Sequence, residues 1–588
     1  MLAAMLAIGV AWAPATRAQA SQGGAPTREE VERAPVRSAP PPGARLAIDS
    51  GPAQPPCALD DTRYDALQVR LTEVSFTGLG PVSPELLRPA YAGELGADRK
   101  LGVLCAIRDR AAAILNDAGY LAVVEIPEQQ LSDGQATFRV VLGRLTAVRV
   151  RGEVGRSQAV IARTLEPLTR QPVFNRADAE RVLLLAGDLP GHEVRLSLRA
   201  AGTGPGELVG EVAVVRTTAL VTANIQNYGS DALGPFGGLV TAELFGLTGL
   251  GDRTTLSAFT TLDFAEQATL RLGHDFRVGG GGLVLSGQIT GSWGHPTVDL
   301  DDIDIDTSTL FATLQASYPL ARTRAFTSRG AIGLDLVDQD VDLNELALTR
   351  DRLRVLFARL DFDTIDQASL AFQNGYSSFA PRWRAAGALD VRQGLDIIDA
   401  SSDCRRSIAA CFGPGRVPTS RVGADPTGLL ARFAGTAEYR PVPEVAIVVG
   451  VRGQVSGDPL LAFEEFSAGN YTIGRGYDPG TILGDSGLGA SLEARYGLLL
   501  PKSRDAVAFQ PYAFVDLSKV WNEDAAGFGG ASARLSSIGA GLRAVWGDRA
   551  QADAALAVPL ERAGAQDRRG DVRFLLSITT KLLPWSVP

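Results

Sequence analysis

The sequence predicts a membrane all-β protein, in which a C-terminal transmembrane β-barrel of about sixteen strands follows two small α+β domains. From about Thr218 onward, apolar and polar residues alternate over segments of about ten residues, as in strands with one lipid face and one wet face. Before this region, a β-α-α-β-β pattern occurs twice, which indicates an internal duplication. No stretch of about 18 uncharged apolar residues follows the N-terminal segment, so no membrane helix is expected.

The N-terminus predicts an exported protein. Residues 1–20 contain an apolar segment and end in a small-x-small pattern, although no positive charge precedes the apolar segment. Such a pattern is typical of a cleavage site, so we expect a signal peptide at 1–20. Residues 21–66 are then a Pro-rich linker, within which Thr27 to Arg33 is a possible plug helix and disorder is the alternative.

Length and charge restrict the classes of function. A chain of 588 residues is long enough for three or four domains. Its formal net charge is −9, and it contains no run of five or more Lys or Arg residues. Nucleic acid is therefore not an expected partner.

The chain contains four cysteines, which allow three disulfide connectivities. We expect the two local pairs, Cys57 with Cys105 and Cys404 with Cys411, because each pair lies within one predicted region. Both bonds fit an oxidising compartment. No Cys-x-x-Cys pattern is present, so these residues are not expected to bind zinc.

The duplicated pattern divides the N-terminal part into units at residues 67–145 and 146–217. In the first unit, Ser83 is an expected helix N-cap and Gly119 an expected helix stop. The elements expected there are a strand near Val69 to Phe76, helices at Ser83 to Tyr91 and Leu101 to Ala118, and strands at Leu121 to Pro127 and Ala136 to Leu142. The elements expected in the second unit are a strand at Leu145 to Arg151, helices at Ser157 to Leu165 and Arg176 to Leu189, and strands at His192 to Leu198 and Glu207 to Arg216.

Residues 218–588 are expected to form the barrel. One clear strand places apolar residues at alternate positions from Leu488 to Leu498, with Glu493 and Arg495 on the opposite parity. A strand with its share of loop takes about 20 to 25 residues, which gives about sixteen strands. An even number closes the barrel and leaves no edge. A soluble β-sandwich is the alternative, but its strands are shorter, at about five or six residues.

The stretch Gly474-Arg475-Gly476-Tyr477 is the main candidate for a functional site. Glycines permit a tight turn with positive φ, and an arginine held in a barrel needs an anionic partner. Asp516 is the expected partner, because its apolar sequence neighbours would face lipid and so turn its side chain toward the lumen. The pair either locks a loop inside the barrel or stabilises the barrel, and removing one partner costs about 3 to 5 kcal/mol.

Three motifs make the chain resemble a known family. Residues 466–477 resemble the signature of a loop that folds back into the lumen, and residues 512–518 resemble the strand that receives its arginine. Two departures are Gly474 before the arginine and Ser518 where glycine is usual. Residues 227–230 with 247–253 resemble the first barrel hairpin. The family is that of the two-partner-secretion outer-membrane transporters, the haemolysin secretion/activation and filamentous-haemagglutinin exporters, which are related to the outer-membrane barrel insertases.

The resemblance covers nearly the whole chain and implies two periplasmic POTRA domains followed by an outer-membrane pore. The pore would export an unfolded haemolysin- or haemagglutinin-like exoprotein that carries an N-terminal secretion domain. The resemblance implies no enzyme activity and no cofactor. The other expected contacts of the pore are outer-membrane lipids and the barrel assembly machinery. A monomer is expected. The implied site residues are Arg475, Gly476, Tyr477 and Asp516 for locking or gating, with Phe466, Gly469, Gly474 and Ser518 in support.

The exoprotein is expected to add an extended segment to an exposed edge strand, at Leu121 to Pro127 or His192 to Leu198. The main alternative function is an assembly factor that inserts other barrels, although such relatives usually carry more POTRA units. A plain diffusion porin would lack both these units and the Arg475 motif.

Two other patterns are weaker candidates. The Gly-Asp-Ser-Gly stretch at 484–487 is similar to the nucleophile motif of trypsin-like proteases, but such a serine needs a histidine base oriented by a carboxylate. The chain has only three histidines, none in a suitable context: His192, His274 and His295. Five aspartates crowd residues 299–306, without the EF-hand glycine and glutamate that calcium binding would need, so a solvated acidic loop is favoured.

Overall fold

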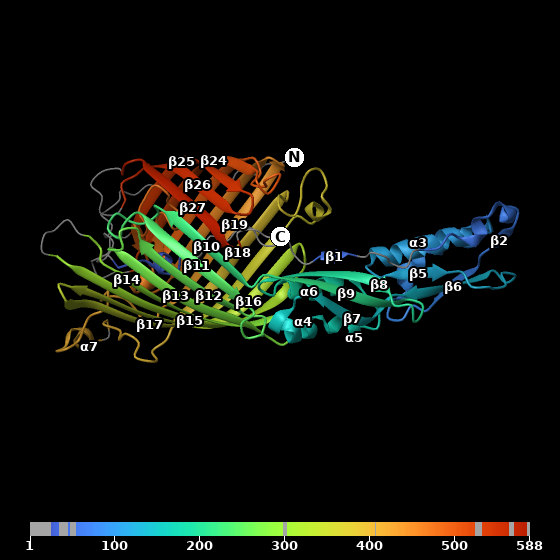
Figure 1. Cartoon of the computed structure of the whole chain (residues 1–588), viewed down its shortest axis with the longest axis horizontal. Helices are drawn as coiled ribbons and strands as arrows, with labels where there is room; N and C mark the ends of the chain where they lie inside the picture. The colour runs from blue at the N-terminus through green and yellow to red at the C-terminus, as the bar shows by residue number, and fades with distance from the viewer. Residues whose placement is uncertain are drawn as a thin grey trace.

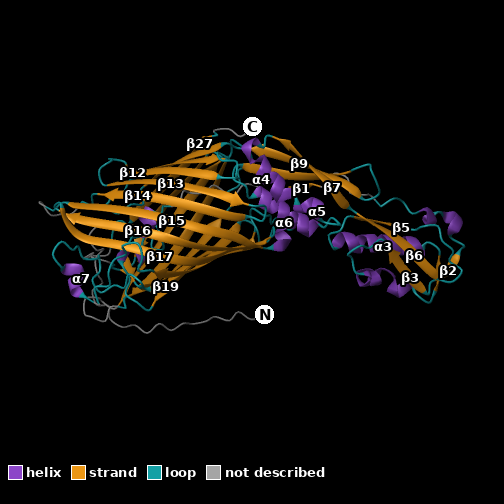
Figure 2. Cartoon of the chain, turned by 90° about the horizontal axis from the view of Figure 1, so that it is seen from below, coloured by secondary structure: helices purple, strands orange, loops and turns teal. Residues whose placement is uncertain are grey.

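The computed structural model describes residues 25–33, 45–47, 54–297, 303–405, 407–523, 532–563 and 570–584. The expected signal peptide lies outside these ranges, as do three of the clustered aspartates, Asp299, Asp301 and Asp302. Figures 1 and 2 show an elongated molecule, with a β-barrel at one end and two α+β units in a row beyond it.

The first α+β unit contains a three-stranded sheet in the order β3-β6-β5 and a two-stranded sheet of β2 and β4. The strands are β2 (Gln68–Arg70), β3 (Glu73–Thr77), β4 (Asp98–Lys100), β5 (Ala122–Glu125) and β6 (Gln135–Leu142). Helix α3 (Val103–Asp117) buries Leu104, Ile107 and Leu115 against the sheet. It ends before Gly119, whose φ of 88° suits glycine.

The helix expected at Ser83 to Tyr91 is divided into shorter turns. They are a 3₁₀ turn at Pro84–Leu87, helix α2 (Arg88–Tyr91) and a second 3₁₀ turn at Ala92–Glu94. Ser83 stands at the N-cap position of the first turn, as expected, but its side chain makes no capping hydrogen bond. The N–H of Leu86 bonds instead to the Ser83 carbonyl at 3.1 Å, the i→i+3 pattern of a 3₁₀ turn.

Both expected disulfides are confirmed. The bond between Cys57 and Cys105 joins the segment before β2 to helix α3. The bond between Cys404 and Cys411 joins the loop after β18 to helix α7 (Ile408–Phe412), which contains Cys411.

The second α+β unit has one sheet in the order β1-β8-β9-β7. Its elements are β1 (Arg45–Ala47), β7 (Arg144–Gly152), α4 (Gln158–Leu165), α5 (Pro167–Arg170), α6 (Arg176–Gly187), β8 (His192–Ala200) and β9 (Glu207–Arg216). The helices and the sheet share a core that includes Val160, Leu183 and Leu196. Strand β1 comes from the linker and pairs in parallel with β8, which the sequence did not predict.

The two units meet in a close junction. Leu121 of the first unit is buried in the core of the second. The N–H of Arg176 donates to the carbonyl of Gly119 at 2.8 Å, and the N–H of Phe174 donates to the carbonyl of Gly143 at 2.7 Å. Two backbone hydrogen bonds, both donated by the second unit to carbonyls of the first, therefore connect the two units.

Sixteen antiparallel strands close the barrel, as expected, and the first strand pairs with the last. The strands are β10 (Ala219–Gln226), β11 (Gly237–Phe245), β12 (Arg253–Thr261), β13 (Gln267–Val278), β14 (Leu283–Gly294), β15 (Ile305–Arg322), β16 (Phe326–Leu343), β17 (Leu346–Ile365), β18 (Trp383–Gly394), β19 (Leu429–Val442), β20 (Val445–Ser456), β23 (Ser486–Tyr496), β24 (Val507–Trp521), β25 (Ser532–Trp546), β26 (Ala550–Pro559) and β27 (Arg573–Leu583).

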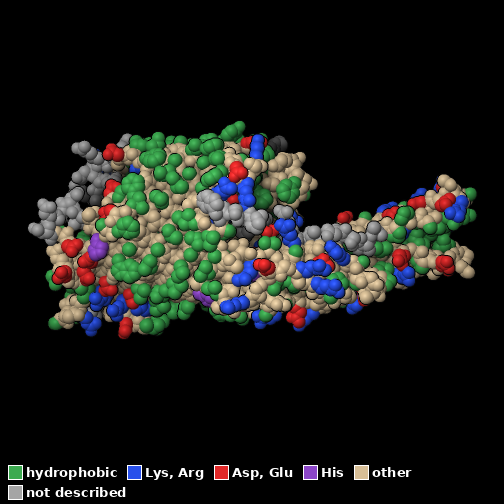
Figure 3. Space-filling view, viewed as in Figure 1, with side chains coloured by type: hydrophobic (Ala, Val, Ile, Leu, Met, Phe, Trp, Pro, Cys, Tyr) green, Lys and Arg blue, Asp and Glu red, His purple; other side chains and the backbone are tan. Residues whose placement is uncertain are grey.

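The barrel strands carry apolar side chains outward and polar side chains inward. On β13, Leu270 and Leu272 are 55% and 48% exposed, whereas Thr269 is 6% exposed. Apolar side chains accordingly cover much of the outer surface of the barrel in Figure 3. Among the described residues, no helix has the length and apolar character that a membrane crossing requires.

The second α+β unit lies against one end of the barrel. Arg322 of β15 donates two hydrogen bonds to the Asp188 carboxylate, both at 2.8 Å. Arg156 donates to the carbonyl of Leu247 at 2.8 Å, in the turn between β11 and β12. The Asp252 carboxylate accepts hydrogen bonds from several backbone N–H groups of that turn, and these bonds fix the conformation of the turn. The hairpin motif at 247–253 thus forms a docking point for the α+β unit.

Candidate functional site

A long loop between β20 and β23 folds back into the barrel; we call it the luminal loop (residues 457–485). It contains the short hairpin of β21 (Phe466–Ala468) and β22 (Ile482–Gly484). The expected loop residues all lie on it. Asp516 and Ser518 lie on β24, and both are buried, at 1% and 4% exposure. The structure therefore gathers the predicted residues in one place.

Three glycines shape the tip of the luminal loop. Gly469 and Gly474 have φ values of 147° and 136°, where residues with a Cβ are strained. A Cβ on Gly469 would also lie 2.0 Å from the carbonyl oxygen of Asp478. Gly476 is needed for space, because a Cβ there would lie 2.9 Å from the Cβ of Ser537 on β25.

Arg475 binds the inner face of the barrel through a forked contact. Its Nε and Nη2 donate to the two carboxylate oxygens of Asp516 at 2.9 and 2.8 Å, and its backbone N–H donates to the same carboxylate at 3.0 Å. Nη1 donates to Glu493 at 2.8 Å, and Nη2 donates to the Ser491 hydroxyl at 2.9 Å. The guanidinium carbon lies 3.5 Å from the ring centroid of Phe514, a cation–π contact. Only a planar guanidinium can make these contacts together.

Tyr477, two residues after Arg475, also holds the loop on the barrel. Its side chain is buried, and its hydroxyl lies 2.9 Å from the carbonyl oxygens of Ser536 and Glu561, toward which it can donate. The same hydroxyl accepts from the N–H of Glu561 at 3.1 Å. The ring belongs to an apolar cluster with Phe466 and Ile482, so the loop is held by both polar and apolar contacts.

Ser518 fits the site although the resemblance leads one to expect glycine there. Its hydroxyl donates to the carbonyl of Ile473 at 3.0 Å. The serine therefore adds a hydrogen bond between β24 and the luminal loop, directly beside Gly474, and does not displace the loop.

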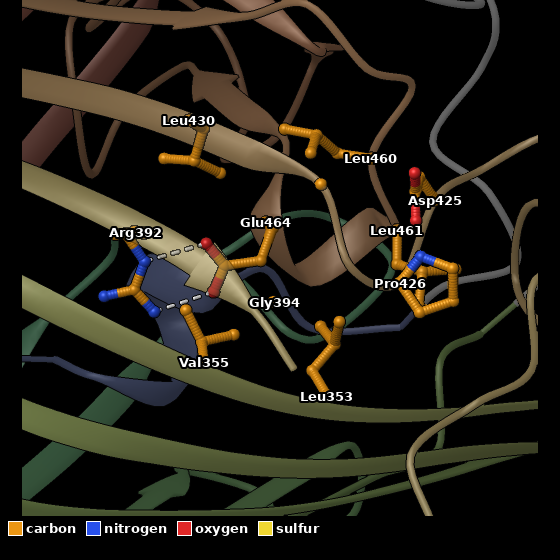
Figure 4. Close-up of a pocket in the computed structure, with 11 residues that line it drawn as sticks. Leu353, Val355, Arg392, Gly394, Asp425, Pro426, Leu430, Leu460, Leu461 and Glu464 are labelled. Atoms are coloured by element: carbon orange, nitrogen blue, oxygen red, sulfur yellow. Dashed lines mark hydrogen bonds and ion pairs between the residues drawn. The ribbon is translucent and has the colours of Figure 1, made fainter. Parts of the chain in front are cut away.

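A second anchor holds the luminal loop at Glu464, before β21, and the sequence did not predict it. Glu464 is buried and accepts hydrogen bonds from Arg392 of β18 at 3.0 and 2.9 Å, as Figure 4 shows. Arg432 of β19 lies 2.9 Å from the same carboxylate. Arg392 also donates to Asp335 of β16 at 2.7 Å. Only the inward parity of these strand residues could have signalled the anchor, and parity does not identify which loop they meet.

The helix expected in the linker lies against inward-facing side chains of the barrel. Helix α1 (Arg28–Val31) begins after Thr27, which forms a capping box with Glu30. The Arg28 guanidinium lies 3.2 Å from Glu464, so the helix shares the carboxylate of the second anchor. At the other end, Arg271 of β13 donates to two backbone carbonyls at 3.0 and 3.1 Å, groups that a helix end leaves without partners.

The Gly-Asp-Ser-Gly stretch at 484–487 is part of the loop framework. Asp485 is fully buried and accepts from Arg421 at 3.1 Å and from the N–H of Leu460 at 2.6 Å. The Ser486 hydroxyl accepts from the N–H of Ser456 at 3.0 Å and donates to its carbonyl at 3.3 Å. The serine is thus engaged with backbone, and no histidine is among the hydrogen-bond partners that the structure describes for it.

The clustered aspartates give no metal geometry in the part of the chain that is described. Asp306 pairs with His295, and the N–H of Asp304 donates to Asn344 at 2.8 Å. The described residues contain one set of potential ligand atoms close together, Cys57, Asp60 and Cys105. Its two cysteines are joined in a disulfide and are not free to bind a metal.

The lumen contains a cavity of about 290 Å³ beside Arg475. Its walls are polar: Arg543 contacts Glu493 at 2.6 Å and Asp553 at 3.0 Å, and the Tyr512 hydroxyl donates to Asp553 at 2.6 Å. The volume corresponds to about ten water molecules.

The two edge strands expected to receive a partner both contact the linker. Strand β5 ends its sheet, but the side-chain amide of Gln54 accepts from the N–H of Val124 at 3.1 Å and donates to its carbonyl at 2.6 Å. Strand β8 is not an exposed edge along its whole length, which corrects the prediction. Strand β1 pairs with it from Arg195 to Ser197.

Comparisons with known proteins agree with this architecture. The model of the family "Haemolysin secretion/activation protein ShlB/FhaC/HecB" matches residues 214–544. The fold is similar to that of CdiB from Escherichia coli, with a TM-score of 0.68 and 16% identity over 90% of this chain and 93% of that one. It is also similar to CdiB from Acinetobacter baumannii, with a TM-score of 0.60 and 16% identity over 91% and 95%. No curated protein sequence matches the chain.

Proposed function

The chain belongs to the haemolysin secretion/activation protein family, and from this membership and the luminal loop site we infer an outer-membrane pore that exports a partner exoprotein to the cell surface. The barrel lies in the outer membrane, and the two α+β units, as POTRA domains, lie in the periplasm. The protein is a transporter and not an enzyme. The observation that carries this conclusion is a sixteen-stranded barrel with the Arg475 loop inside it, preceded by two α+β units.

We propose that the luminal loop and helix α1 together keep the pore closed at rest. The loop is held at two points, by Arg475 on Asp516 and by Glu464 on Arg392. The helix is tied to the second point through Arg28. Buried ion pairs of this kind resist separation, because an unpaired buried charge costs about 3 to 5 kcal/mol. Export then requires both the loop and the helix to move.

We propose that the POTRA units recognise an N-terminal secretion domain of a haemolysin- or haemagglutinin-like exoprotein. Edge strands β5 and β8 support this role, because an extended segment can pair with them by main-chain hydrogen bonds. Transport uses no nucleotide. Folding of the exoprotein outside the cell drives transport outward. An exoprotein variant that cannot fold should therefore stall in the barrel.

We further propose how the barrel contacts the surrounding membrane, other copies of the chain and the assembly machinery. Outward-facing side chains such as Leu492 and Leu542, 52% and 45% exposed, meet outer-membrane lipids directly. The barrel closes on itself, which supports a monomer. The barrel assembly machinery inserts the chain into the membrane.

The experiment that tests the function compares cells with and without this gene, in both the culture medium and the outer membrane. Loss of one large protein from the medium, with other barrel proteins unchanged, is the expected result, and it identifies the exoprotein. A broad fall in many outer-membrane barrels would instead assign the chain to barrel assembly and overturn the proposal.

A further inference from the structure

A group of apolar side chains on the inner wall of the barrel carries an inference about the exoprotein, which rests on the proposed function. The group spans three neighbouring strands and interrupts a wall that is otherwise polar. We propose that it is a contact surface for the exoprotein in transit, and that it binds extended segments with an apolar side chain at every second position. We call it the inner-wall patch; its residues are Phe311 of β15, Val337 of β16, and Leu353 and Val355 of β17.

The strand register places the four residues of the inner-wall patch side by side. Phe311 is the Cα partner of Val337, and Val337 is the Cα partner of Leu353. Val355 lies two residues farther along β17 and therefore faces the same way. All four side chains are buried, whereas Leu356, the next residue of β17, is 43% exposed on the outer surface. The patch therefore faces the lumen as one continuous apolar surface.

Polar residues border the inner-wall patch on both sides along the strands. On the outer side, Thr309 and Gln339 are Cα partners, and the Gln339 amide donates to the Thr309 hydroxyl at 3.1 Å. On the periplasmic side, Thr313 is the partner of Asp335, which accepts from Arg392. The inner wall of a water-filled barrel is normally polar. Apolar side chains at this position therefore need an apolar partner whenever the lumen is open.

Other segments of the chain cover the inner-wall patch at rest. The ring centroids of Phe463 and Phe311 lie 5.9 Å apart. Figure 4 shows Leu461 of the luminal loop near Leu353 and Val355. When the pore opens as proposed above, the helix and the luminal loop leave the patch, and the passing chain can reach it. The covering residues are Val31 of helix α1, Ala424 of the loop after β18, and Leu461 and Phe463 of the luminal loop.

The position and spacing of the inner-wall patch fit an extended chain near the end of its passage. Phe311 is the seventh of the eighteen residues of β15, counted from the end away from the POTRA units, so the patch lies in the outer half of the lumen. Leu353 and Val355 are two residues apart on one strand, a separation of about 6.6 to 6.8 Å. Residues i and i+2 of an extended polypeptide have the same separation and face the same way, whereas a helix turns them to different faces.

A surface of this kind suits transport more than stable binding. Hydrophobic attraction is non-directional, and the four side chains offer no hydrogen bond that would fix one register. Successive apolar residues of the exoprotein can therefore exchange on the patch as the chain moves outward. The polar side chains of the same extended segment face the water in the lumen on its other side.

Photo-cross-linking during export tests whether the exoprotein contacts the inner-wall patch. A photo-reactive phenylalanine analogue replaces Phe311 in one strain and Gln315 in another; Gln315 has the same inward parity on β15, four residues nearer the periplasmic end. Leu310, which faces outward and is 46% exposed, is the background control. We expect about fourfold more exoprotein adduct from position 311 than from position 315, the factor that one additional buried methylene gives. Equal yields at 311 and 315 would overturn the proposal and leave transport through the lumen intact.

Substitutions that keep the shape of the patch test whether the contact contributes to export. The double variant Val337→Thr/Val355→Thr places two hydroxyl groups on the patch. Val341→Thr is the matched control, because Val341 is also a buried, inward-facing valine of β16 but lies outside the cluster. Export per folded barrel should fall about tenfold in the double variant, since a hydroxyl that loses its water on contact weakens the contact, and it should stay unchanged in the control.

The results separate the possible roles of the inner-wall patch. If the patch only seats helix α1 and the luminal loop, the double variant will conduct more often in planar bilayers while its export stays at the wild-type level, and this result would overturn the proposal. If the double variant does not accumulate as a folded barrel, the comparison of positions 311 and 315 decides. A wild type that exports nothing would overturn the proposed function itself.

Discussion

At the scale of single residues, Arg475 joins the luminal loop to the barrel wall through its whole guanidinium group. It reaches Asp516, Glu493 and Ser491 at once. Asp516 has 1% of its surface exposed, so it has little access to water that could replace the arginine. Arg475 and Asp516 thus form an ion pair that the sequence could predict, because strand parity alone turns Asp516 inward.

Arg475→Ala should impair export more than it impairs barrel assembly. The change leaves a buried carboxylate without its partner and weakens the anchor by about 3 kcal/mol, which is about a hundredfold in the equilibrium between held and released loop. Arg475→Lys keeps the positive charge but cannot make the forked contact. Its export should therefore lie between that of the wild type and that of Arg475→Ala. The measurement is exported protein per unit of folded barrel, with Arg350→Ala at an exposed site of β17 as the control. Wild-type export by Arg475→Ala at matched barrel levels would contradict the role of the loop.

His192 should make the second POTRA unit sensitive to acid. Its ring is largely buried at the start of β8, with Nδ1 2.8 Å from the Pro190 carbonyl, and this burial lowers the pKa of the imidazole. The folded unit therefore prefers the neutral ring, while the unfolded chain titrates near pH 6.5. The stabilisation is complete above about pH 6.5 and is lost as pH falls through that value toward the lower folded pKa. Denaturant unfolding at about pH 7.5 and 5.5 should show a larger loss for the wild type than for His192→Gln; equal losses would exclude His192 as the cause.

At the scale of elements, helix α1 and the luminal loop behave as one unit because they share Glu464. The carboxylate lies among Arg28 of the helix, Arg392 of β18 and Arg432 of β19. Neither element can leave its place without separating at least one ion pair. The coupling was not predictable from the sequence, because the polar parity of a strand shows that a side chain points inward but not which loop meets it.

Glu464→Gln should therefore open the pore more often. Removing the charge leaves three arginines without their common partner, at a cost of about 3 kcal/mol or more. In planar lipid bilayers we expect more frequent open-level conductance than in the wild type, and an intermediate frequency for Arg28→Ala, which frees only the helix. Glu438→Gln, which changes a carboxylate of β19 paired with Arg440, is the control. Unchanged conductance in Glu464→Gln would show that this anchor does not keep the pore closed.

At the scale of the whole molecule, the sequence predicts what depends on periodicity. The barrel strands, the two repeated units and the inward position of Asp516 all follow from alternation or helical spacing, and the structure agrees with each. The domain limits at 66/67, 145/146 and 217/218 stay predictions. What could not be predicted depends on contacts between distant segments. Strand β1 has only three residues and carries no pattern of its own, so its pairing with β8 appears only in the fold.

Passage of the exoprotein through the barrel is the central claim, and site-specific photo-cross-linking during export tests it most directly. Val448 lines the luminal cavity, whereas its neighbour Val449 faces outward with 40% of its surface exposed. A photo-reactive phenylalanine analogue is placed at each position in turn, in cells that are exporting protein. The account predicts a light-dependent adduct with the exoprotein from position 448 and none from position 449. Continued export with no adduct at 448, or with equal adducts at both positions, would contradict transport through the lumen.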